Sequence, residues 1–392
     1  MNVTKLKLNS FNSFIITLLI LFVLIIIFSS NNDDYDDADD DDDDNSNISI
    51  KRQRMLPLPN YYRSKMNFSI TINDNLSTLL DLKDFQFLIN EPNICRSSFD
   101  HSEQQYSNIF LAIFIHSATK NFDKRDIIRK TWGNHSIGFG IDNHYNVRLV
   151  FMLGTTKNQT IQNQIQQESQ HYGDIIQGSF LDTYRNITYK HVMGLKWINH
   201  FCPHASYILK ADDDIFIDLH QLIYYLHGKF GDHPQRLMAC YVNKNSRVSR
   251  SYRNKWRVSY KEYSEQYYPA YCDGWTIIMS NDITLDLYRI AGNRPLLWID
   301  DVFISGILAN DLHIDHFDFR KSIHCYKNEN VKNWLIKSTK SSAISIPPML
   351  SLIDANHYND PNEISHTIIS LWNKTVEYYR YNLNISIDQI KV

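Results

Sequence analysis

Short, uninterrupted apolar runs alternate with amphipathic stretches between residues 109 and 210. The runs that we predict to be strands are Ile109–Ile115, Val147–Leu153, Asp174–Ile176 and Ser206–Lys210. Runs rich in β-branched residues are typical of strands that are buried on both faces of a parallel sheet. The stretches that we predict to be helices are Asn121–Thr131, Gln159–Tyr172 and Tyr184–Phe201. Strands that alternate with helices predict an α/β fold with a doubly wound sheet.

A longer apolar segment, Phe14–Phe28, lies near the N-terminus and contains one threonine. As a helix, residues 11–30 would span about 30 Å, the thickness of a bilayer core. Lys5 and Lys7 precede the segment, and ten aspartates follow it between residues 33 and 44. The positive-inside rule then predicts a type II, single-pass membrane protein. A cleaved signal peptide is the alternative, but the residues that follow Phe28 make a poor small-residue cleavage site.

This pattern predicts four parts of the chain. They are a cytoplasmic tail (1–10), a transmembrane signal-anchor (11–30), an acidic and disordered stem (31–85) and a lumenal domain (86–392). The composition, with 43% apolar and 21% charged residues, is that of a globular protein and excludes collagen and overall disorder. Most of the acidic excess lies in the stem, so the body is mildly basic. That balance suits an anionic small ligand and is too weak to indicate nucleic acid.

Two further features agree with a lumenal domain. Asn-X-Ser/Thr acceptors occur at Asn47, Asn67, Asn75, Asn134, Asn158, Asn186, Asn373 and Asn384. We select Asn134, Asn158 and Asn186, which lie in the predicted domain, as candidate glycosylation sites. The five cysteines are Cys95, Cys202, Cys240, Cys272 and Cys325. In an oxidising compartment most of them would pair, and the odd number leaves one free or intermolecular.

Three consecutive aspartates, Asp212, Asp213 and Asp214, follow the fourth predicted strand. In an extended segment Asp212 and Asp214 point to the same side, whereas Asp213 turns away. Ligands of doubly wound sheets bind beyond the carboxyl ends of the strands, where these residues lie. Paired carboxylates at this place suit Mg²⁺ or Mn²⁺ shared with substrate phosphates. An EF-hand is excluded, because its glycine and its final glutamate are both missing.

Seven blocks in order resemble the β-1,3-galactosyltransferase family (glycosyltransferase family 31, β-1,3-glycosyltransferases). The blocks are residues 87–95 (FLINEPNIC), 125–133 (RDIIRKTWG), 172–190 (YGDII to Lys190), 197–202 (Trp197 and Cys202), 210–216 (KADDDIF), 268–274 (YPAYCDG) and 300–306 (DDVFISG). The resemblance implies a GT-A-type, Rossmann-like catalytic domain with a mixed sheet. It also implies a Golgi membrane enzyme that uses a UDP-sugar donor, a glycan, glycoprotein or glycolipid acceptor and Mn²⁺. The expected reaction is hexosyl transfer, most simply of galactose, with inversion to a β-1,3 linkage.

The resemblance assigns roles to individual residues. Asp301 matches the catalytic base, and its apolar flanks should raise its pKa. Asp300 is the better candidate for the N-cap of the helix that follows. Asp214 and Asp212 are the expected metal ligands, although Asp212 could bind the ribose instead. The family's third metal ligand is an imidazole, for which His357 is the first candidate and His324 and His366 are the rivals.

Six residues are assigned to the donor pocket: Arg125, Arg129, Asp182, Lys190, Asp213 and Gly274. Arg125 and Arg129 lie one helical turn apart and could bind uracil or the diphosphate, or form a solvated helix face. Trp132 and Tyr184 fit the core and the pocket equally well.

Some positions depart from the family pattern. Asp300 stands where glutamate is usual, and Asp273 and Trp275 interrupt a run of small residues, which predicts a bulkier pocket floor. The donor could therefore be UDP-N-acetylglucosamine. A non-catalytic lumenal glycan-binding protein is the alternative from another functional class, which the retention of Asp212, Asp214 and Asp301 disfavours.

Overall fold

The computed structural model describes residues 76–96, 109–134, 146–321, 325–340, 345–354 and 361–383. The predicted cytoplasmic tail, the predicted anchor and nearly all of the predicted stem lie outside these ranges. Within them, none of the helices combines the length and the apolar character needed to cross a bilayer. Leu79 and Phe85 are fully buried, so the folded domain begins before residue 86 and the predicted stem is too long at its C-terminal end.

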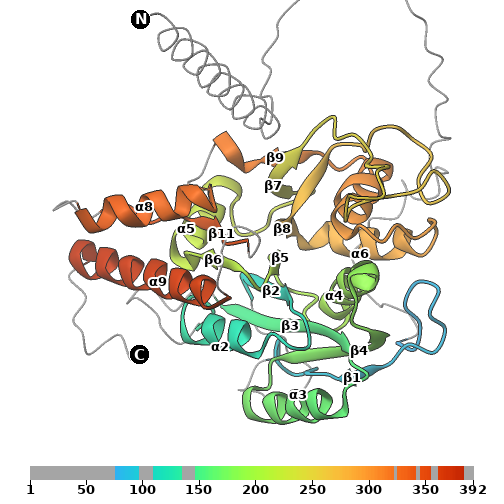
Figure 1. Cartoon of the computed structure of the whole chain (residues 1–392), viewed down its shortest axis with the longest axis horizontal. Coiled ribbons are helices and arrows are strands. Elements are labelled where there is room, and N and C mark those ends of the chain that lie inside the picture. Colours follow the sequence, from blue (N-terminus) through green and yellow to red (C-terminus); the bar gives the residue numbers. More distant parts are fainter. Residues whose placement is uncertain are drawn as a thin grey trace, which may run out of the picture. The chain divides into compact units, whose positions relative to one another are not determined.

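The strands form two sheets (Figure 1). Those of the larger sheet are β1 (Phe87–Ile89), β2 (Leu111–His116), β3 (Val147–Thr155), β4 (Ile175–Leu181), β5 (Tyr207–Asp212), β7 (Met238–Asn243), β8 (Tyr271–Ser280) and β9 (His316–Asp318). Those of the smaller sheet are β6 (Ile215–Ile217), β10 (Cys325–Lys327) and β11 (Leu350–Leu352).

The main helices are α2 (Phe122–Lys130), α3 (Gln159–Tyr172), α4 (Ile187–Phe201), α5 (Leu219–Phe230), α6 (Asn281–Ala291), α8 (Glu329–Lys340) and α9 (Pro361–Leu383). The short ones are the 3₁₀ helices η2 (Tyr184–Asn186) and η4 (Phe319–Lys321), the π-helix η3 (Val302–Leu308) and its continuation α7 (Ala309–Asp311). Helix α4 packs against α6, and α9 contacts both α2 and α8 (Figure 1).

The larger sheet has the order β1-β4-β3-β2-β5-β8-β7-β9. Strands β4, β3, β2 and β5 are parallel, whereas β8 runs antiparallel to both β5 and β7. The chain moves outward from β2 to β4 and then returns to the other side of β2 to form β5. The switch point of the fold therefore lies at the carboxyl ends of β2 and β5, where doubly wound sheets bind their ligands. The prediction of a mixed, doubly wound α/β sheet is confirmed.

The four predicted strands and three predicted helices are all present, with ends that shift by a few residues. The largest change is in the third strand, which extends to Leu181 because β4 also pairs with β1. The predicted helix Tyr184–Phe201 starts as η2 and continues as α4. Helix α3 has the predicted bounds, since the side chain of Asn158 accepts from the amides of residues 160 and 161 and Gly173 ends the helix with a φ of 63°.

Two disulfides connect distant parts of the domain. Cys95 pairs with Cys202, across 107 residues of sequence, and Cys240 pairs with Cys272, so that β7 and β8 are linked. Cys325 is the free cysteine among the described residues. Four of the five cysteines thus pair and one does not, as the odd number predicts.

Candidate active site

Asp212 ends β5, and its Cα lies opposite that of His116 at the end of β2. The turn formed by Asp213 and Asp214 follows directly and leads into β6. The acidic triplet therefore lies at the switch point of the sheet, as predicted. The second part of the candidate site consists of Asp300 and Asp301, directly before η3. These residues come from the C-terminal half of the domain.

Asp213 is buried, whereas its two neighbours are partly exposed. Its carboxylate accepts hydrogen bonds from Ser117 Oγ at 2.7 Å, Asn121 Nδ2 at 2.8 Å and Lys124 Nζ at 3.1 Å. These donors come from the end of β2 and the beginning of α2. Asp213 thus holds α2 against the sheet, which corrects its assignment to the donor pocket.

Asp212 and Asp214 keep part of their carboxylates accessible, with 34% and 24% of each side chain exposed. Lys210 Nζ donates to Asp212 Oδ1 at 2.6 Å, and Lys124 Nζ lies 3.6 Å from Asp214 Oδ2. Burial raises the pKa of Asp212 despite Lys210, and it raises the pKa of Asp214 to about 7 despite Lys124. Carboxylates in this state favour a cation that neutralises them, and their oxygens suit Mg²⁺ or Mn²⁺. The two aspartates therefore fit the ion that the sequence implies.

The predicted imidazole ligand is not located by the structure. His357 and its rival His324 lie outside the described residues. His366, the other rival, is exposed on α9.

Asp301 lies at the N-terminus of η3, and its Oδ1 accepts from the amide of Val302 at 2.7 Å. Asp301 is therefore the N-cap, and the prediction that Asp300 caps this helix is wrong. Burial, followed by the charge of Asp300, raises the pKa of Asp301 well above its ordinary value. This direction agrees with the prediction from the apolar flanks. A carboxyl with a raised pKa is a stronger base when it is ionised, which is the property needed to accept a proton near neutral pH.

Gly274 and Lys210 connect Asp301 to the acidic triplet. A Cβ placed on Gly274 would lie 3.2 Å from Asp301 Oδ2, so Gly274 packs directly against the carboxylate. Lys210, which is buried, donates both to the carbonyl oxygen of Gly274 and to Asp212 Oδ1. One lysine thus joins the strand that carries the triplet to the strand that contacts Asp301.

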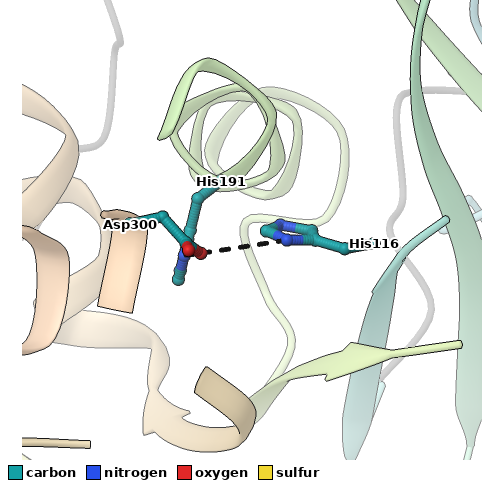
Figure 2. Close-up of side chains that lie close together, drawn as sticks. All are labelled: His116, His191 and Asp300. Atoms are coloured by element: carbon teal, nitrogen blue, oxygen red, sulfur yellow. Dashed lines mark hydrogen bonds and ion pairs between the residues drawn. The ribbon is translucent and has the colours of Figure 1, made fainter. Parts of the chain in front are cut away.

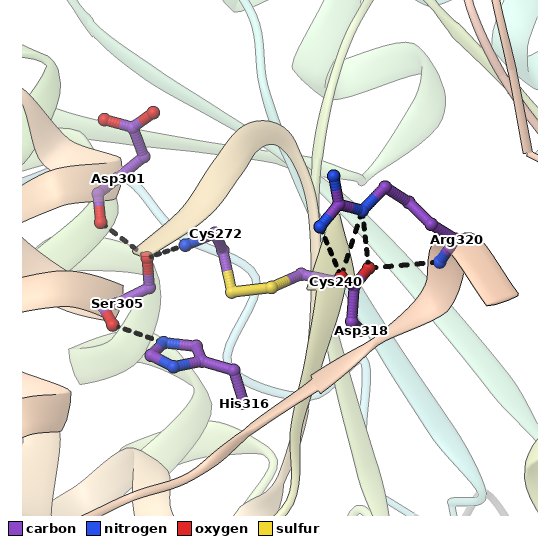
Figure 3. Close-up of a disulfide and its surroundings, with 7 residues drawn as sticks. All are labelled: Cys240, Cys272, Asp301, Ser305, His316, Asp318 and Arg320. Carbon is purple, nitrogen blue, oxygen red and sulfur yellow. Dashed lines mark hydrogen bonds and ion pairs between the residues drawn. A yellow bond between two sulfur atoms is a disulfide. The ribbon is translucent and has the colours of Figure 1, made fainter. Parts of the chain in front are cut away.

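The Cys240–Cys272 disulfide helps to fix the backbone at Asp301 (Figure 3). The amide of Cys272 donates to Ser305 Oγ at 2.8 Å, and Ser305 Oγ donates to the carbonyl oxygen of Asp301 at 2.6 Å. His316 Nε2 lies 2.7 Å from the carbonyl oxygen of Ser305. These contacts tie the first turn of η3 to β8 and β9 and leave the carboxylate of Asp301 to the site.

The side chain of Asp300 is buried and reaches α4. Its Oδ2 lies 2.8 Å from His191 Nδ1, which belongs to α4. Burial acts to raise the pKa of Asp300, but Lys210 and His191 hold it below its ordinary value. The two adjacent carboxyls therefore have opposite shifts.

Arg125 and Arg129 lie on one face of α2 as predicted, and Arg125 reaches the triplet only through Ser117 Oγ, which donates to Asp213. Arg125 is fully buried and donates to both carboxylate oxygens of Glu168, to Ser117 Oγ and to the carbonyl oxygen of residue 118. Arg129 donates to Glu168 and, through two nitrogens, to Asp174. The two arginines join α2 to α3 and to the start of β4, and neither the donor-pocket role nor a solvated face describes them.

Lys190 and Asp182 form a buried pair, with Lys190 Nζ 2.9 Å from Asp182 Oδ1. Lys190 also donates to the carbonyl oxygen of Ser117 at 2.6 Å, and Asp182 Oδ2 accepts from the amide of Gly154 at 2.9 Å. The pair thereby ties together the carboxyl ends of β2, β3 and β4. It lies at the expected edge of the sheet, but its polar atoms bind one another instead of pointing outward.

An aromatic group lies beside the carboxylates. Tyr184 has its ring centroid 5.1 Å from that of Trp256 and 5.7 Å from that of Trp298, and the two indoles stack nearly parallel. Tyr184 and Trp256 are exposed, whereas Trp298 is buried. Burial and then the charge of Asp301 raise the pKa of Tyr184, which places its hydroxyl within electrostatic range of the proposed base. Tyr184 therefore belongs to the rim of the site.

Other expected pocket residues belong to the core. Trp132 is buried, and its indole donates to the carbonyl oxygen of Ile215 at 3.0 Å. Trp275 is also buried, and Asp273 pairs with Lys327 at 2.5 Å.

Sequence reasoning missed Lys210, Ser117, His116 and His191. Only Lys210 had a usable signal, because it precedes Asp212 by two residues in a strand and therefore shares its face. The other three become neighbours of the site only through strand pairing and helix packing.

The candidate glycosylation sites differ in their surroundings. Asn158 is exposed at the N-cap of α3, and Asn134 is half-buried after α2. Asn186 Nδ2 donates to the carbonyl oxygen of Leu181 at 2.9 Å. A glycan on that nitrogen would disrupt this bond, so the structure favours Asn158 over Asn186.

Comparison with known proteins agrees with this geometry. Residues 123–320 match the family model described as Galactosyltransferase. The chain belongs to the β-1,3-galactosyltransferase family. Beta-1,3-galactosyltransferase 1 of Homo sapiens is 33% identical over 250 residues, which cover 64% of this chain and 69% of that protein. Lactosylceramide 1,3-N-acetyl-beta-D-glucosaminyltransferase of Rattus norvegicus is 33% identical over 276 residues, which cover 67% and 72%.

The matched region of this galactosyltransferase-family chain contains the triplet, Lys210, Gly274 and Asp301, and the described domain is a glycosyltransferase domain. Among solved structures, a glycosyltransferase involved in the glycosylation of the major capsid of PBCV-1 aligns with a TM-score of 0.37 and 7% identity. It covers 66% of this chain and 98% of that chain. The fold assignment does not rest on that similarity.

Proposed function

We propose that the protein transfers galactose from UDP-galactose to a hydroxyl of an acceptor glycan, with inversion to a β-1,3 linkage and with Mn²⁺ as cofactor. The observation that carries the proposal is the connection from Asp212 through Lys210 and Gly274 to Asp301. We infer from this connection that the two carboxylates proposed to bind the cation and the carboxylate proposed as the base face one site from two sides. An inverting transfer needs these two functions on opposite sides of the anomeric carbon.

Each proposed role follows from the surroundings of the residue. Asp301 accepts the proton of the acceptor hydroxyl as that oxygen forms its bond to the anomeric carbon. The bond from the anomeric carbon to the diphosphate breaks in the same step, and UDP leaves with the bonding electrons. Asp212 and Asp214 would hold a divalent cation, which would neutralise charge on the departing diphosphate. Lys210 keeps Asp212 oriented and holds the backbone of Gly274 near Asp301.

The acceptor side of the proposal rests on Tyr184 and Trp256. Sugar rings bind to flat, exposed aromatic faces. Tyr184 lies within electrostatic range of Asp301, and Trp256 packs against Tyr184. The indole of Trp298 is nearly parallel to that of Trp256, with 6.2 Å between the ring centroids and 7° between the planes. We therefore assign the sugar residue of the acceptor to this aromatic group.

The donor is tested with a panel of nucleotide sugars. The purified full-length protein is incubated with Mn²⁺, with UDP-galactose, UDP-N-acetylglucosamine or UDP-glucose, and with acceptors that end in N-acetylglucosamine or in lactose. We expect transfer from UDP-galactose and a β-1,3 linkage in the product. Transfer from UDP-N-acetylglucosamine alone would replace galactose in the proposal, and this alternative has support because one of the two relatives above is named for that sugar. Binding of UDP without transfer to any acceptor would favour the non-catalytic alternative.

The proposed location is the Golgi membrane, with a type II anchor at residues 11–30 and the catalytic domain in the lumen. The lysines before this segment, the aspartates after it and the two disulfides of the domain support this topology. Glycosidase treatment should increase the mobility of the protein on a gel. A mature N-terminus near residue 31 would show a cleaved signal peptide instead.

A further inference from the structure

Three potential metal ligands meet beneath the site, and none of them belongs to the acidic triplet (Figure 2). His116 ends β2, His191 lies in α4, and Asp300 precedes η3. All three are buried, with relative exposures of 5%, 0% and 6%. One nitrogen or oxygen atom of each lies within 4.8 Å of the atoms from the other two. The fold thus brings together residues that are separated by 75 and 109 positions in the chain.

The hydrogen bonds within this group leave several polar atoms without a partner. Asp300 Oδ2 lies 2.8 Å from His191 Nδ1 and 3.9 Å from His116 Nδ1. Among the described residues, neither ring nitrogen of His116 has a hydrogen-bond partner, and His191 Nε2 also has none. Leaving a buried polar atom without a partner is unfavourable. Of these atoms, His116 Nδ1 is the one that lies near the carboxylate, and its 3.9 Å from Asp300 Oδ2 is too long for a hydrogen bond and short enough for both atoms to bind one ion.

We propose that His116, His191 and Asp300 bind a transition metal ion of the zinc class, at a site separate from the cation site at Asp212 and Asp214. Two imidazoles and one carboxylate are a common ligand set for zinc. The oxygen-only triplet prefers harder ions. Burial lowers the pKa of both imidazoles, and the neutral imidazole is the form that binds a metal.

Two lysines lie close enough to lower the pKa of His116, yet each has a carboxylate of its own. Lys190 pairs with Asp182, and Lys210 pairs with Asp212. Asp300 accepts no hydrogen bond from either lysine among the described contacts. The field of Lys210 and the contact with His191 favour the ionised form of Asp300, which is the form that can bind an ion.

The position of the ion assigns it a structural task. Asp300 is the residue before Asp301, so a metal that fixes Asp300 against α4 and the end of β2 also fixes the N-terminus of η3. His116 and His191 are positioning residues, because they act on Asp301 only through Asp300. The ion itself contacts neither the donor nor the acceptor.

The test measures metal content, which does not depend on activity. Full-length protein without a polyhistidine tag is purified from zinc-supplemented cells, dialysed against metal-free buffer and examined by mass spectrometry of its metals. We expect about one zinc per chain. His116→Gln and His191→Gln should lose most of it. The exposed His366→Gln and the triplet variant Asp214→Asn should keep it.

If the histidine variants fail to fold, X-ray absorption at the zinc edge of the wild-type protein decides the question. We expect zinc with nitrogen and oxygen ligands and with the scattering pattern of two imidazoles. Wild-type protein that binds no transition metal even after reconstitution would overturn the proposal. So would zinc that is unaffected by His116→Gln and His191→Gln. The three residues would then be a hydrogen-bonded histidine–aspartate cluster only.

Discussion

The side chain of Asp301 packs against Gly274 so closely that a side chain at position 274 would push against it. A Cβ on Gly274 would lie 3.2 Å from Asp301 Oδ2, 3.3 Å from its Cβ and 3.4 Å from its Cγ. These distances are at or below the short end of ordinary van der Waals contacts. The position of the proposed base therefore depends on the absence of a side chain at residue 274 of β8. The backbone at Gly274 is in turn held by Lys210.

Gly274→Ala should therefore displace the carboxylate of Asp301. We expect turnover to fall by about tenfold to a hundredfold, because displacements below 1 Å at a reacting group have effects of this size. The affinity for UDP with Mn²⁺ should change little, since the triplet is not touched. Steady-state kinetics and UDP titration measure the two quantities. Gly228→Ala in α5 is the control, because a Cβ there meets nothing within 4 Å. Equal turnover in both variants would contradict the packing argument.

Asp214→Asn should have opposite effects on stability and on metal binding. Because the folded-state pKa of Asp214 is raised from its ordinary value of 3.8 to about 7, ionisation of this carboxyl destabilises the metal-free fold progressively between these two pH values. The neutral variant should therefore unfold at a higher temperature at pH 8 with chelator, by about 1–2 kcal/mol of stability, gain less at pH 5, and gain nothing below pH 3.8.

The same variant should lose the rise in melting temperature that Mn²⁺ and UDP give the wild-type protein. Asp286→Asn is a matched control, because burial also raises the pKa of Asp286 in α6. That variant should keep the full response to Mn²⁺. An unchanged response in Asp214→Asn would show that Asp214 is not a metal ligand.

Arg125 should matter for stability and not for the donor. Arg125→Met leaves Glu168 buried without its main partner, and the removal of one member of a buried pair costs about 3–5 kcal/mol. Denaturant unfolding should show this loss, and the double variant Arg125→Met/Glu168→Gln should recover much of it. At a temperature where the variant is folded, its UDP affinity should match the wild type. A stable variant with weak UDP binding would restore the donor-pocket role.

Trp256 should affect the acceptor alone. Trp256→Ala removes one aromatic face. We expect the acceptor KM to rise about tenfold, which corresponds to a loss of roughly 1.4 kcal/mol of binding free energy. The KM for the donor should stay the same, and Trp256→Phe should recover part of the loss. Tyr252→Ala is the control from the same loop, because Tyr252 is 87% exposed and stacks on Arg257 instead. An unchanged acceptor KM in Trp256→Ala would remove the aromatic group from the acceptor site.

The strands and helices in the first half of the domain could be predicted because they depend on residues that are close together in the sequence. An apolar run such as Val147–Leu153 forms a strand whatever its position in the sheet. Gly173 ends α3 because its own backbone adopts the left-handed conformation. The position of Asp212 followed from the rule that ligands bind at the carboxyl ends of parallel strands. The sequence blocks that resemble the β-1,3-galactosyltransferase family then predicted that the triplet and Asp301 belong to one site.

The rest depends on contacts between distant residues. Strand β6 has three residues and pairs with β11, which lies more than 130 positions later in the chain. The arginines of α2 were assigned to the donor because their partner Glu168 is 43 positions from Arg125 and its side chain could not be placed. Asp300 looked like a helix cap because nothing in the sequence indicates that His191 reaches it from α4.

The most direct test of the proposed function is the comparison of Asp301→Asn with the wild-type protein. Asparagine has nearly the same shape but cannot accept the proton of the acceptor hydroxyl. We expect turnover to fall by about a hundredfold or more, with the loss in kcat, while the affinity for UDP with Mn²⁺ stays unchanged. Normal turnover in this variant would contradict the account, because Asp301 would then be only the N-cap of η3. A loss of UDP affinity would contradict it in another way, because Asp301 would then bind the donor or the cation and the base would have to be a different residue.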